Sequence, residues 1–147
     1  MNNGTLVRAT FFPILFFIRP LHHPSPRNIT LHGILHALAD PTRLAIVAAL
    51  KEQQLCTAPG DDDGINCVET MERVKQALPK STCSQHFLIL REAGLIRSER
   101  KGVELFSRLR CSEIEERFPG LLQSILAAHQ AARCRGDAEG ETGEDSC

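Results

Sequence analysis

One stretch of the chain places small polar side chains beside a group of cations, and this combination suits recognition chemistry. Hydroxyl and amide groups can hydrogen-bond to base edges in a DNA groove, and arginine or lysine can neutralise phosphates. We predict base-edge and nearby phosphate contacts by Lys80, Ser81, Thr82, Ser84 and Gln85. We predict further contacts, to phosphates, by Arg97, Arg100 and Lys101.

The element that must hold the first group is a helix. Cys83, Phe87 and Leu90 recur at intervals of four and three, so they share one face and point inward. The opposite face then carries the polar side chains. Gly94 can take the left-handed conformation that ends a helix, so the spacing predicts a helix over residues 80–93.

A basic hairpin is predicted to follow that helix. Residues 97–100 and 103–107 flank Gly102, which permits a positive φ in a tight turn. Residues 80–110 carry seven lysines and arginines against three glutamates, although the net charge of the whole chain is −1. The fold class predicted is mainly α with a small β-hairpin wing, a winged helix-turn-helix. Charge and periodicity alone more often accompany an ordinary solvated helix and hairpin.

Three motifs resemble the bacterial ArsR/SmtB family of winged-helix repressors. They are Asp40-Pro41-Thr42-Arg43, Ser81-Thr82 with Ser84 and His86, and Leu90-Arg91-Glu92-Ala93-Gly94-Leu95. The resemblance covers roughly residues 29–130 and implies a DNA-binding transcriptional repressor. Two positions depart from the family pattern: Pro79 replaces a helix-capping serine, and Leu88 replaces a lysine or arginine. The second departure removes one phosphate contact.

The resemblance also implies a homodimer whose first and last helices form a two-fold interface. Each subunit would place its 80–93 helix in successive major grooves of an imperfect palindrome, with half-site centres about 10 base pairs or a multiple apart. Apolar stripes suit such an interface. In the first helix, predicted over residues 30–39, the stripe comprises Leu31, Ile34, Leu35 and Leu38. In the last, which Pro119-Gly120 kinks or divides, it comprises Ile114, Phe118, Leu121, Leu122, Ile125 and Leu126.

The six cysteines have irregular spacing, with no Cys-x-x-Cys and no secretory context, so we predict reduced thiols in a cytoplasmic protein. Cys56 and Cys67 border an acidic loop predicted over residues 52–66. Family members often release DNA when a metal ion, arsenite or an oxidant acts on such thiols. Cys56 and Cys67 could form a two-thiolate site for a soft metal(loid) or a redox pair, or both could be incidental loop thiols. No cofactor is required.

Other reactive side chains have simpler interpretations. His32 and His36 lie four apart and could share a metal ion, but no third ligand is evident and solvent-facing histidines are the commoner explanation. Cys83 and His86 could suggest a thiol enzyme. Cys83 falls on the packing face, however, and no oxyanion donors or orienting third group can be identified, so we do not expect an enzyme.

Composition divides the chain into one domain with two tails. In residues 1–28 the largely apolar stretch between Arg8 and Arg19 has only ten residues, too few to cross a bilayer, which needs about 20. We interpret them as a disordered arm or upstream sequence from a mis-assigned start, with a membrane-surface tether as the alternative; no membrane partner is expected. The DNA-binding and dimerisation domain is predicted over 29–134. An acidic tail without apolar periodicity, predicted to be disordered, occupies 135–147.

The remaining helices are predicted from apolar runs and capping residues. Asp40 caps a central core helix that begins at Pro41, and Arg43 either contacts phosphate or pairs with a carboxylate. Residues 68–78 form the first helix of the helix-turn-helix, and a capping box at Ser112 opens the C-terminal helix. The rival to a DNA-binding regulator is a winged helix that serves only as a protein-interaction module.

Overall fold

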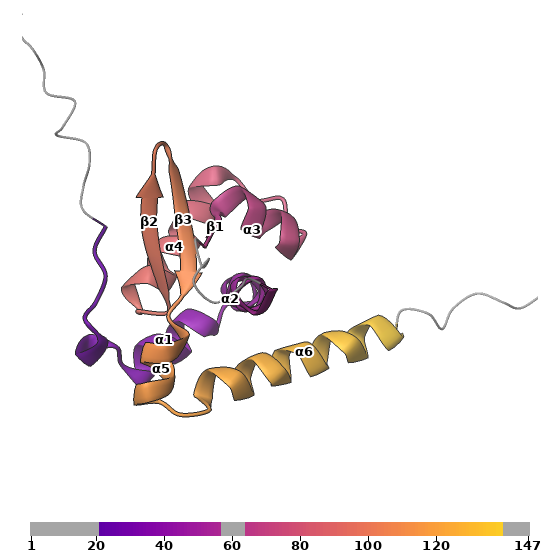
Figure 1. Cartoon of the computed structure of the whole chain (residues 1–147). Helices are drawn as coiled ribbons and strands as arrows, with labels where there is room; N and C mark the ends of the chain where they lie inside the picture. Colours follow the sequence, from indigo (N-terminus) through magenta and orange to yellow (C-terminus); the bar gives the residue numbers. More distant parts are fainter. Residues whose placement is uncertain (1–20, 57–63, 140–147) are drawn as a thin grey trace, which may run out of the picture.

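The computed structural model describes residues 21–56 and 64–139. The helices run around and beneath a small sheet whose hairpin projects at one end, while the last helix extends along the opposite end (Figure 1). This is a winged helix-turn-helix, as predicted. The elements are η2 (Pro26–Asn28), α1 (Leu31–Leu38), α2 (Pro41–Cys56), β1 (Ile65–Asn66), α3 (Cys67–Val74), α4 (Lys80–Glu92), β2 (Ile96–Lys101), β3 (Glu104–Leu109), α5 (Cys111–Arg117) and α6 (Leu121–Glu139).

The sheet has three antiparallel strands in the order β1-β3-β2. β2 and β3 form the wing, with Ile96 opposite Leu109 and Lys101 opposite Glu104, so the turn consists of Gly102 and Val103. Gly102 has a φ of +63°, as the hairpin prediction requires. β1, which the sequence analysis assigned to a loop over 52–66, pairs with β3 instead. The same loop prediction was wrong at its start, because α2 continues to Cys56.

Helix α2 is the core helix, as its apolar run predicted. Its residues Ile46, Val47 and Leu50 are at most 1% exposed. Asp40 caps it, since the carboxylate accepts a hydrogen bond from the Arg43 backbone N–H at 2.9 Å. The Arg43 side chain donates to the backbone oxygens of Ala37 and His36 at 2.6 and 3.3 Å. Arg43 therefore stabilises the corner between α1 and α2 by capping the end of α1.

Helix α4 ends in a Schellman motif at the glycine that the sequence singled out. The Leu95 N–H donates to the Leu90 oxygen, and the Gly94 N–H donates to the Arg91 oxygen, both at 3.0 Å. Gly94 has a φ of +79°. The chain then turns into β2 through Leu95 and Ile96, both fully buried. This turn fixes the angle between α4 and the wing.

The predicted domain boundary at residue 28 does not match the structure, because residues 21–29 pack on the domain. His23 Nε2 accepts a hydrogen bond from the Ser98 N–H at 2.9 Å, on the edge strand β2. The Pro24 oxygen accepts from the buried Arg110 side chain at 2.9 Å. Ile29 is 1% exposed. Burial and the nearby Arg91 and Arg97 lower the pKa of His23, which keeps the imidazole neutral and able to accept. Residues 1–20 lie outside the described part of the chain.

The C-terminal segment forms two helices, α5 and α6, separated at residues 118–120 as Pro119-Gly120 predicted. The capping box at Ser112 was wrong: α5 begins at Cys111, and the Arg110 side chain instead pairs with Glu113. Helix α6 continues to Glu139, so residues 135–139 are helical although they were assigned to a disordered tail. The rest of that tail, 140–147, lies outside the described residues.

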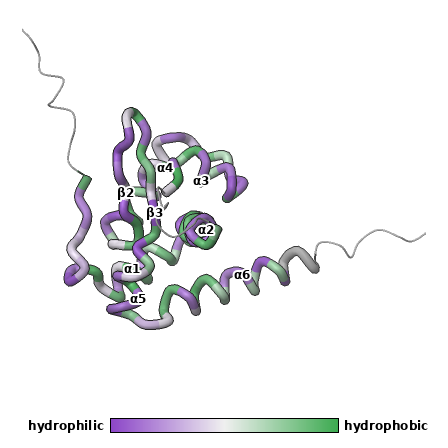
Figure 2. Tube along the Cα trace, viewed as in Figure 1, coloured by the Kyte–Doolittle hydropathy of each residue, from purple (hydrophilic) through white to green (hydrophobic). Residues whose placement is uncertain are grey.

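Hydrophobic residues recur along α6, including the part that extends away from the rest of the chain (Figure 2). Leu122 is buried, and Leu121, Ile125 and Leu126 pack partly against the core. From Gln130 to Arg135 the side chains are exposed. In residues 21–56 and 64–139 no single helix is long and apolar enough to cross a membrane; α1 and α2 would reach that length only across a bend of 104°.

Candidate nucleic-acid interface

Helix α4 presents a small polar face to solvent. Cys83, Phe87 and Leu90 are buried at 5%, 3% and 0% exposure, as their spacing predicted. Among the candidates on the other face, Thr82 is half-buried, and the exposed ones are Lys80, Ser81, Ser84 and Gln85. The helix is therefore anchored by one stripe and leaves its polar stripe open to a partner.

Ser84 and Gln85 differ in the hydrogen-bonding groups that they leave open on this polar face. The Ser84 hydroxyl donates to the Lys80 backbone oxygen at 2.9 Å, so its proton is engaged inside the helix and its oxygen remains an acceptor. Gln85 has an amide with both donors and an acceptor, and it is exposed. Gln85 is thus the side chain on this face best equipped to read a base edge with two hydrogen bonds.

The wing places its cations on two different faces. Side chains alternate along β2, so Arg100 shares the face of Ile96 and Ser98, whereas Arg97 and Lys101 share the other. Ser98 is 1% exposed and bonds to Ser107 on the face that packs against the helices. Arg100 therefore extends this helix-facing side toward the wing tip. The structure does not bring Arg97 together with Arg100.

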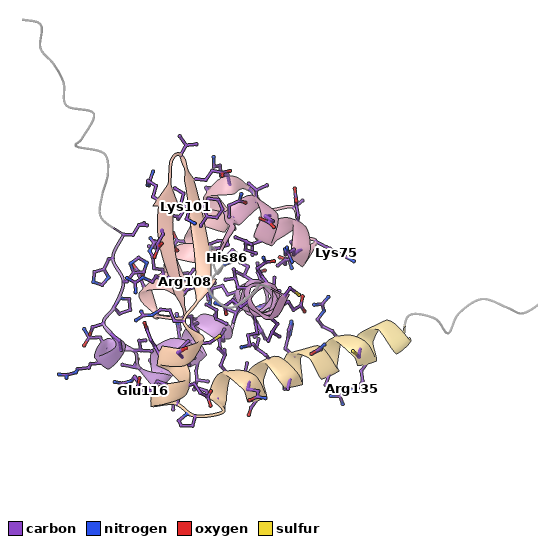
Figure 3. All side chains as sticks on the ribbon, in the orientation of Figure 1. Lys75, His86, Lys101, Arg108, Glu116 and Arg135 are labelled. Atoms are coloured by element: carbon purple, nitrogen blue, oxygen red, sulfur yellow. The ribbon has the colours of Figure 1, made fainter. Side chains whose placement is uncertain are left out.

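On its outer face the wing holds a charge cluster. Glu99 lies 3.7 Å from Arg97 and 4.0 Å from Arg108, two arginines that stand opposite each other across the strands. Their mutual repulsion is offset by this shared carboxylate. Lys101 lies at the tip, with its ammonium 5.3 Å from the centre of the Phe106 ring, where the ring face attracts a cation. Figure 3 shows Lys101 near the tip of the hairpin, far from α6.

Helix α3 braces α4 from behind. Asn66 caps it by accepting the Glu69 N–H at 2.8 Å, and Thr70, fully buried, donates to the Asn66 oxygen. The helix ends at Lys75, which has a left-handed φ of 56° and starts the turn toward α4. Arg73 pairs with Glu69 at 3.3 Å, so its charge is partly neutralised within α3. Of the two cations Arg73 and Lys75, Lys75 is therefore the more available for contact with a partner. The α3-turn-α4 unit is the helix-turn-helix.

The comparisons with known proteins agree with this geometry. Residues 38–99 match a family model described as a helix-turn-helix domain. The HTH-type transcriptional repressor SmtB, from two strains of Mycobacterium tuberculosis, is 32% identical over 125 residues, which make up 84% of this chain and 71% of the repressor.

The chain belongs to the ArsR/SmtB family. It is therefore a DNA-binding transcriptional repressor and not an enzyme. The ArsR/SmtB motif residue His86, half-buried on α4, lies with its Nδ1 4.0 Å from the carboxylate of Asp40. Asp40 also caps α2, so two family motifs meet at the joint between the core helix α2 and helix α4.

The structure places a further thiol, Cys83, next to one of the two predicted sensor cysteines of this ArsR/SmtB protein. Cys67, at the start of α3, lies beside Cys83 of α4, and burial together with that neighbouring thiol raises the pKa of Cys67 to about 11. Cys56 is exposed at the end of α2. The spacing had indicated only that Cys83 faces inward, and its contact with α3 could not be predicted from it.

The histidine pair on α1 does not form a larger ligand cluster. Both His32 and His36 are exposed. No group of three or more histidine, cysteine, aspartate or glutamate side chains comes together in the described ranges of this ArsR/SmtB chain. Two exposed imidazoles one helical turn apart fit the simpler interpretation of solvent-facing histidines.

A groove of about 1020 Å³ lies between the helix-turn-helix and the wing strand β3. The apolar part of its lining includes Val68 and Met71 of α3, Phe87 of α4 and Leu105 of β3. Its rim includes Lys80 and Ser84, two of the predicted DNA contacts, and its wall includes Cys67 and Cys83. Residues of the polar face of α4 and the neighbouring thiols therefore line one concave surface.

Proposed function

We propose that the chain acts as a cytoplasmic homodimer that binds a specific operator through two α4 helices. Each α4 enters one of two successive major grooves of an imperfect palindrome, whose half-site centres lie about 10 base pairs apart or a multiple of that distance. The observation that carries this proposal is the exposed polar stripe on a helix whose opposite stripe is buried. Base contacts come from Ser81, Thr82 and Gln85, and nearby phosphate contacts from Lys80 and Ser84.

The wing contributes contacts to the phosphate backbone. Arg100, on the helix-facing side of β2, and Lys101, at the tip, are the principal candidates. Arg97 was predicted to join them, but its position beside Glu99 on the outer face supports that role less well. Phosphate contacts set orientation and affinity without reading sequence, whereas Gln85 reads sequence.

This proposal predicts different defects for two substitutions. Gln85→Ala should relax sequence preference, with a loss of about 1–3 kcal/mol on the operator and almost none on unrelated DNA. Arg100→Ala should weaken binding to every sequence and reduce the salt slope by about 1. Fluorescence anisotropy measures both defects, with the gene's own upstream DNA and a scrambled duplex as the two ligands. The titrations are repeated at salt concentrations from roughly 50 to 200 mM.

Arg97→Ala is the matched control for the wing, because it removes the same charge from the opposite face of the same strand. It should change operator affinity less than Arg100→Ala. Equal losses from both arginines would mean that charge acts without regard to position. If Arg100→Ala, Arg97→Ala and Gln85→Ala all bound operator with the affinity of wild type, α4 would not dock as proposed. Absence of any specific complex would favour the protein-interaction module.

The dimer proposal rests on apolar residues that the described chain leaves exposed. Leu31 and Leu35, four apart on α1, are 44% and 47% exposed. Helix α6 extends beyond the body with Ala127, Ala128 and Ala131 exposed. A terminal helix with no tertiary packing along its outer half gains stability from a partner surface. We propose that α1 and α6 of two copies form that interface, on the end of the molecule away from the wing tip.

We further propose that a soft metal(loid) or a thiol-directed oxidant releases DNA by acting on Cys67. Cys67 begins α3 and touches Cys83 of α4, so a bond at either sulfur changes the packing beneath the DNA-facing helix. A thiol with a pKa of about 11 must lose a proton to bind a metal, so affinity should rise as the pH rises. Cys56 remains the alternative second thiol.

Operator affinity with and without cadmium or arsenite tests this effector site. We expect wild type to bind operator roughly 5–150-fold more weakly when loaded, and Cys67→Ser and Cys83→Ser to lose this response. Cys56→Ser is the control and should respond like wild type. A lost response in Cys56→Ser but not Cys83→Ser would make Cys56 the partner. An unchanged affinity in wild type would remove the sensor while leaving the repressor.

A further inference from the structure

The groove between the helix-turn-helix and β3 exposes apolar side chains that nothing in residues 21–56 and 64–139 covers. Val68 is 66% exposed and Val103 is 96% exposed, and both line it. At about 1020 Å³, the groove has the size of a site for a large ligand or for several side chains. Apolar surface of this kind, rimmed by charges, is typical of a site that binds another segment.

The described chain begins at this groove. Leu21, the first described residue, is itself part of the lining. The residues after it are fixed: His23 accepts the Ser98 N–H at 2.9 Å, Pro24 accepts from Arg110 at 2.9 Å, and Ile29 is buried. Any residue just before Leu21 is therefore held at the mouth of the groove at a high effective concentration.

The segment ahead of Leu21 has the composition and reach to fill the groove. It contains seven large apolar side chains within nine residues, in the sequence TFFPILFFI from Thr10 to Ile18. Twenty residues can extend about 70 Å at most, so reach does not limit where they bind. Burying such side chains removes their apolar surface from water, which favours docking.

The groove has charges of both signs around its apolar lining. The segment carries Arg8 and Arg19 and no acidic residue. The groove lining includes the carboxylates of Glu72 and Glu104, both on exposed residues at its edges. Three cations also line it, the exposed Lys75 and Lys80 and the half-buried Arg91, so the lining as a whole is not acidic. The apolar floor and the attachment at Leu21, rather than net charge, therefore favour the N-terminal segment as the occupant.

We propose that residues 10–20 dock into this groove and compete with DNA for the α4 face. Lys80 and Ser84 lie on the groove rim and are also proposed DNA contacts, so a docked segment covers part of the DNA-binding surface. Operator binding then requires the segment to leave. If it occupies the groove about 90% of the time, apparent operator affinity falls about tenfold relative to the open form. The inhibitory role rests on the proposed function; the docking itself does not.

Hydrogen exchange of the full chain without DNA tests the docking. We expect the amides of α3 and of the turn at Gly102-Val103 to exchange faster in the double variant Phe16→Ser/Phe17→Ser than in wild type. Val68→Asp, which changes the groove and no proposed DNA contact, should expose the same wing-turn amides. Leu55→Asp is the control, since Leu55 is 73% exposed and does not line the groove. Equal exchange in wild type and the double variant would overturn the proposal.

Operator titration of the same proteins tests the competition. Phe16→Ser/Phe17→Ser and Val68→Asp should each tighten binding about tenfold, and combining them should add little because both release the same segment. Weaker binding by the double variant would mean that the segment contacts DNA, which contradicts the proposal. If no protein binds operator, the proposed function fails while the exchange result still stands.

Three further outcomes would overturn the inference. Protection that grows with protein concentration would place the segment in the groove of another copy. Co-sedimentation of wild type, but not of Phe16→Ser/Phe17→Ser, with vesicles of anionic phospholipid would assign the segment to a membrane surface. The intact mass of the native protein provides the last test, because a chain that begins after residue 18 would lack the occupant altogether.

Discussion

Replacing Leu31 and Leu35 together with glutamate is expected to convert the proposed dimer into a monomer and to weaken operator binding by about 100-fold or more. Both side chains are close to half-exposed in one copy, so the change should leave the monomer folded. In the proposed dimer the two carboxylates would be buried against a like-charged copy, at a cost of several kcal/mol. Losing the second half-site removes the avidity of two linked contacts, which commonly amounts to 10²–10⁴-fold.

Sedimentation equilibrium and anisotropy measure the two effects separately. Wild type should sediment at about twice the chain mass of 16.3 kDa, and the variant at that mass. Leu55→Glu is the matched control, because Leu55 is more exposed than either α1 leucine and lies at the end of α2. It should remain dimeric and bind normally. A Leu31→Glu/Leu35→Glu protein that remained dimeric would show that α1 is not in the interface.

The elements defined by local spacing could be predicted from the sequence. The stripe of Cys83, Phe87 and Leu90 specified which face of α4 is buried, and Gly94 specified where the helix ends. Both depend on residues within a few positions of one another, where periodicity and capping act directly. The family motifs lie in the same local elements, which is why the resemblance and the fold agree.

Features that depend on distant partners could not be predicted in this way. β1 has two residues and exists because Ile65 and Asn66 pair with β3, about forty positions later. The His23 contact with Ser98 spans 75 positions, so composition alone made residues 21–28 look like part of an unstructured arm. The capping box at Ser112 failed because Arg110 pairs with Glu113 and α5 begins at Cys111.

The candidate site shows the same division. Exposure of Lys80, Ser81 and Gln85 followed from helical periodicity. The separation of Arg97 from Arg100 follows from strand alternation, but the face that packs inward is set by the contact between Ser98 and Ser107. The adjacency of Cys67 and Cys83 depends on how α3 packs against α4, so local spacing gave no indication of it.

Gly94→Ala is expected to destabilise the protein by about 2–5 kcal/mol and to lower Tm by roughly 10 °C or more. A side chain at φ +79° costs about 1–2 kcal/mol. The new Cβ would also lie 2.6 Å from Ile29 Cγ1 and 3.2 Å from Pro24 Cγ, so those residues must move. Since Ile29 is 1% exposed, the displacement reaches into the core and typically adds about 1–3 kcal/mol.

Gly102→Ala separates the two causes. Gly102 also has a positive φ, +63°, but a Cβ there meets nothing within 4 Å. Its cost should therefore be the backbone term alone, about 1–2 kcal/mol. Urea unfolding of both variants measures the difference, which reports how firmly Pro24 and Ile29 rest on the α4–β2 turn. Equal costs would mean that this anchor is loose, and a loose anchor would no longer hold the apolar N-terminal segment at the mouth of the groove.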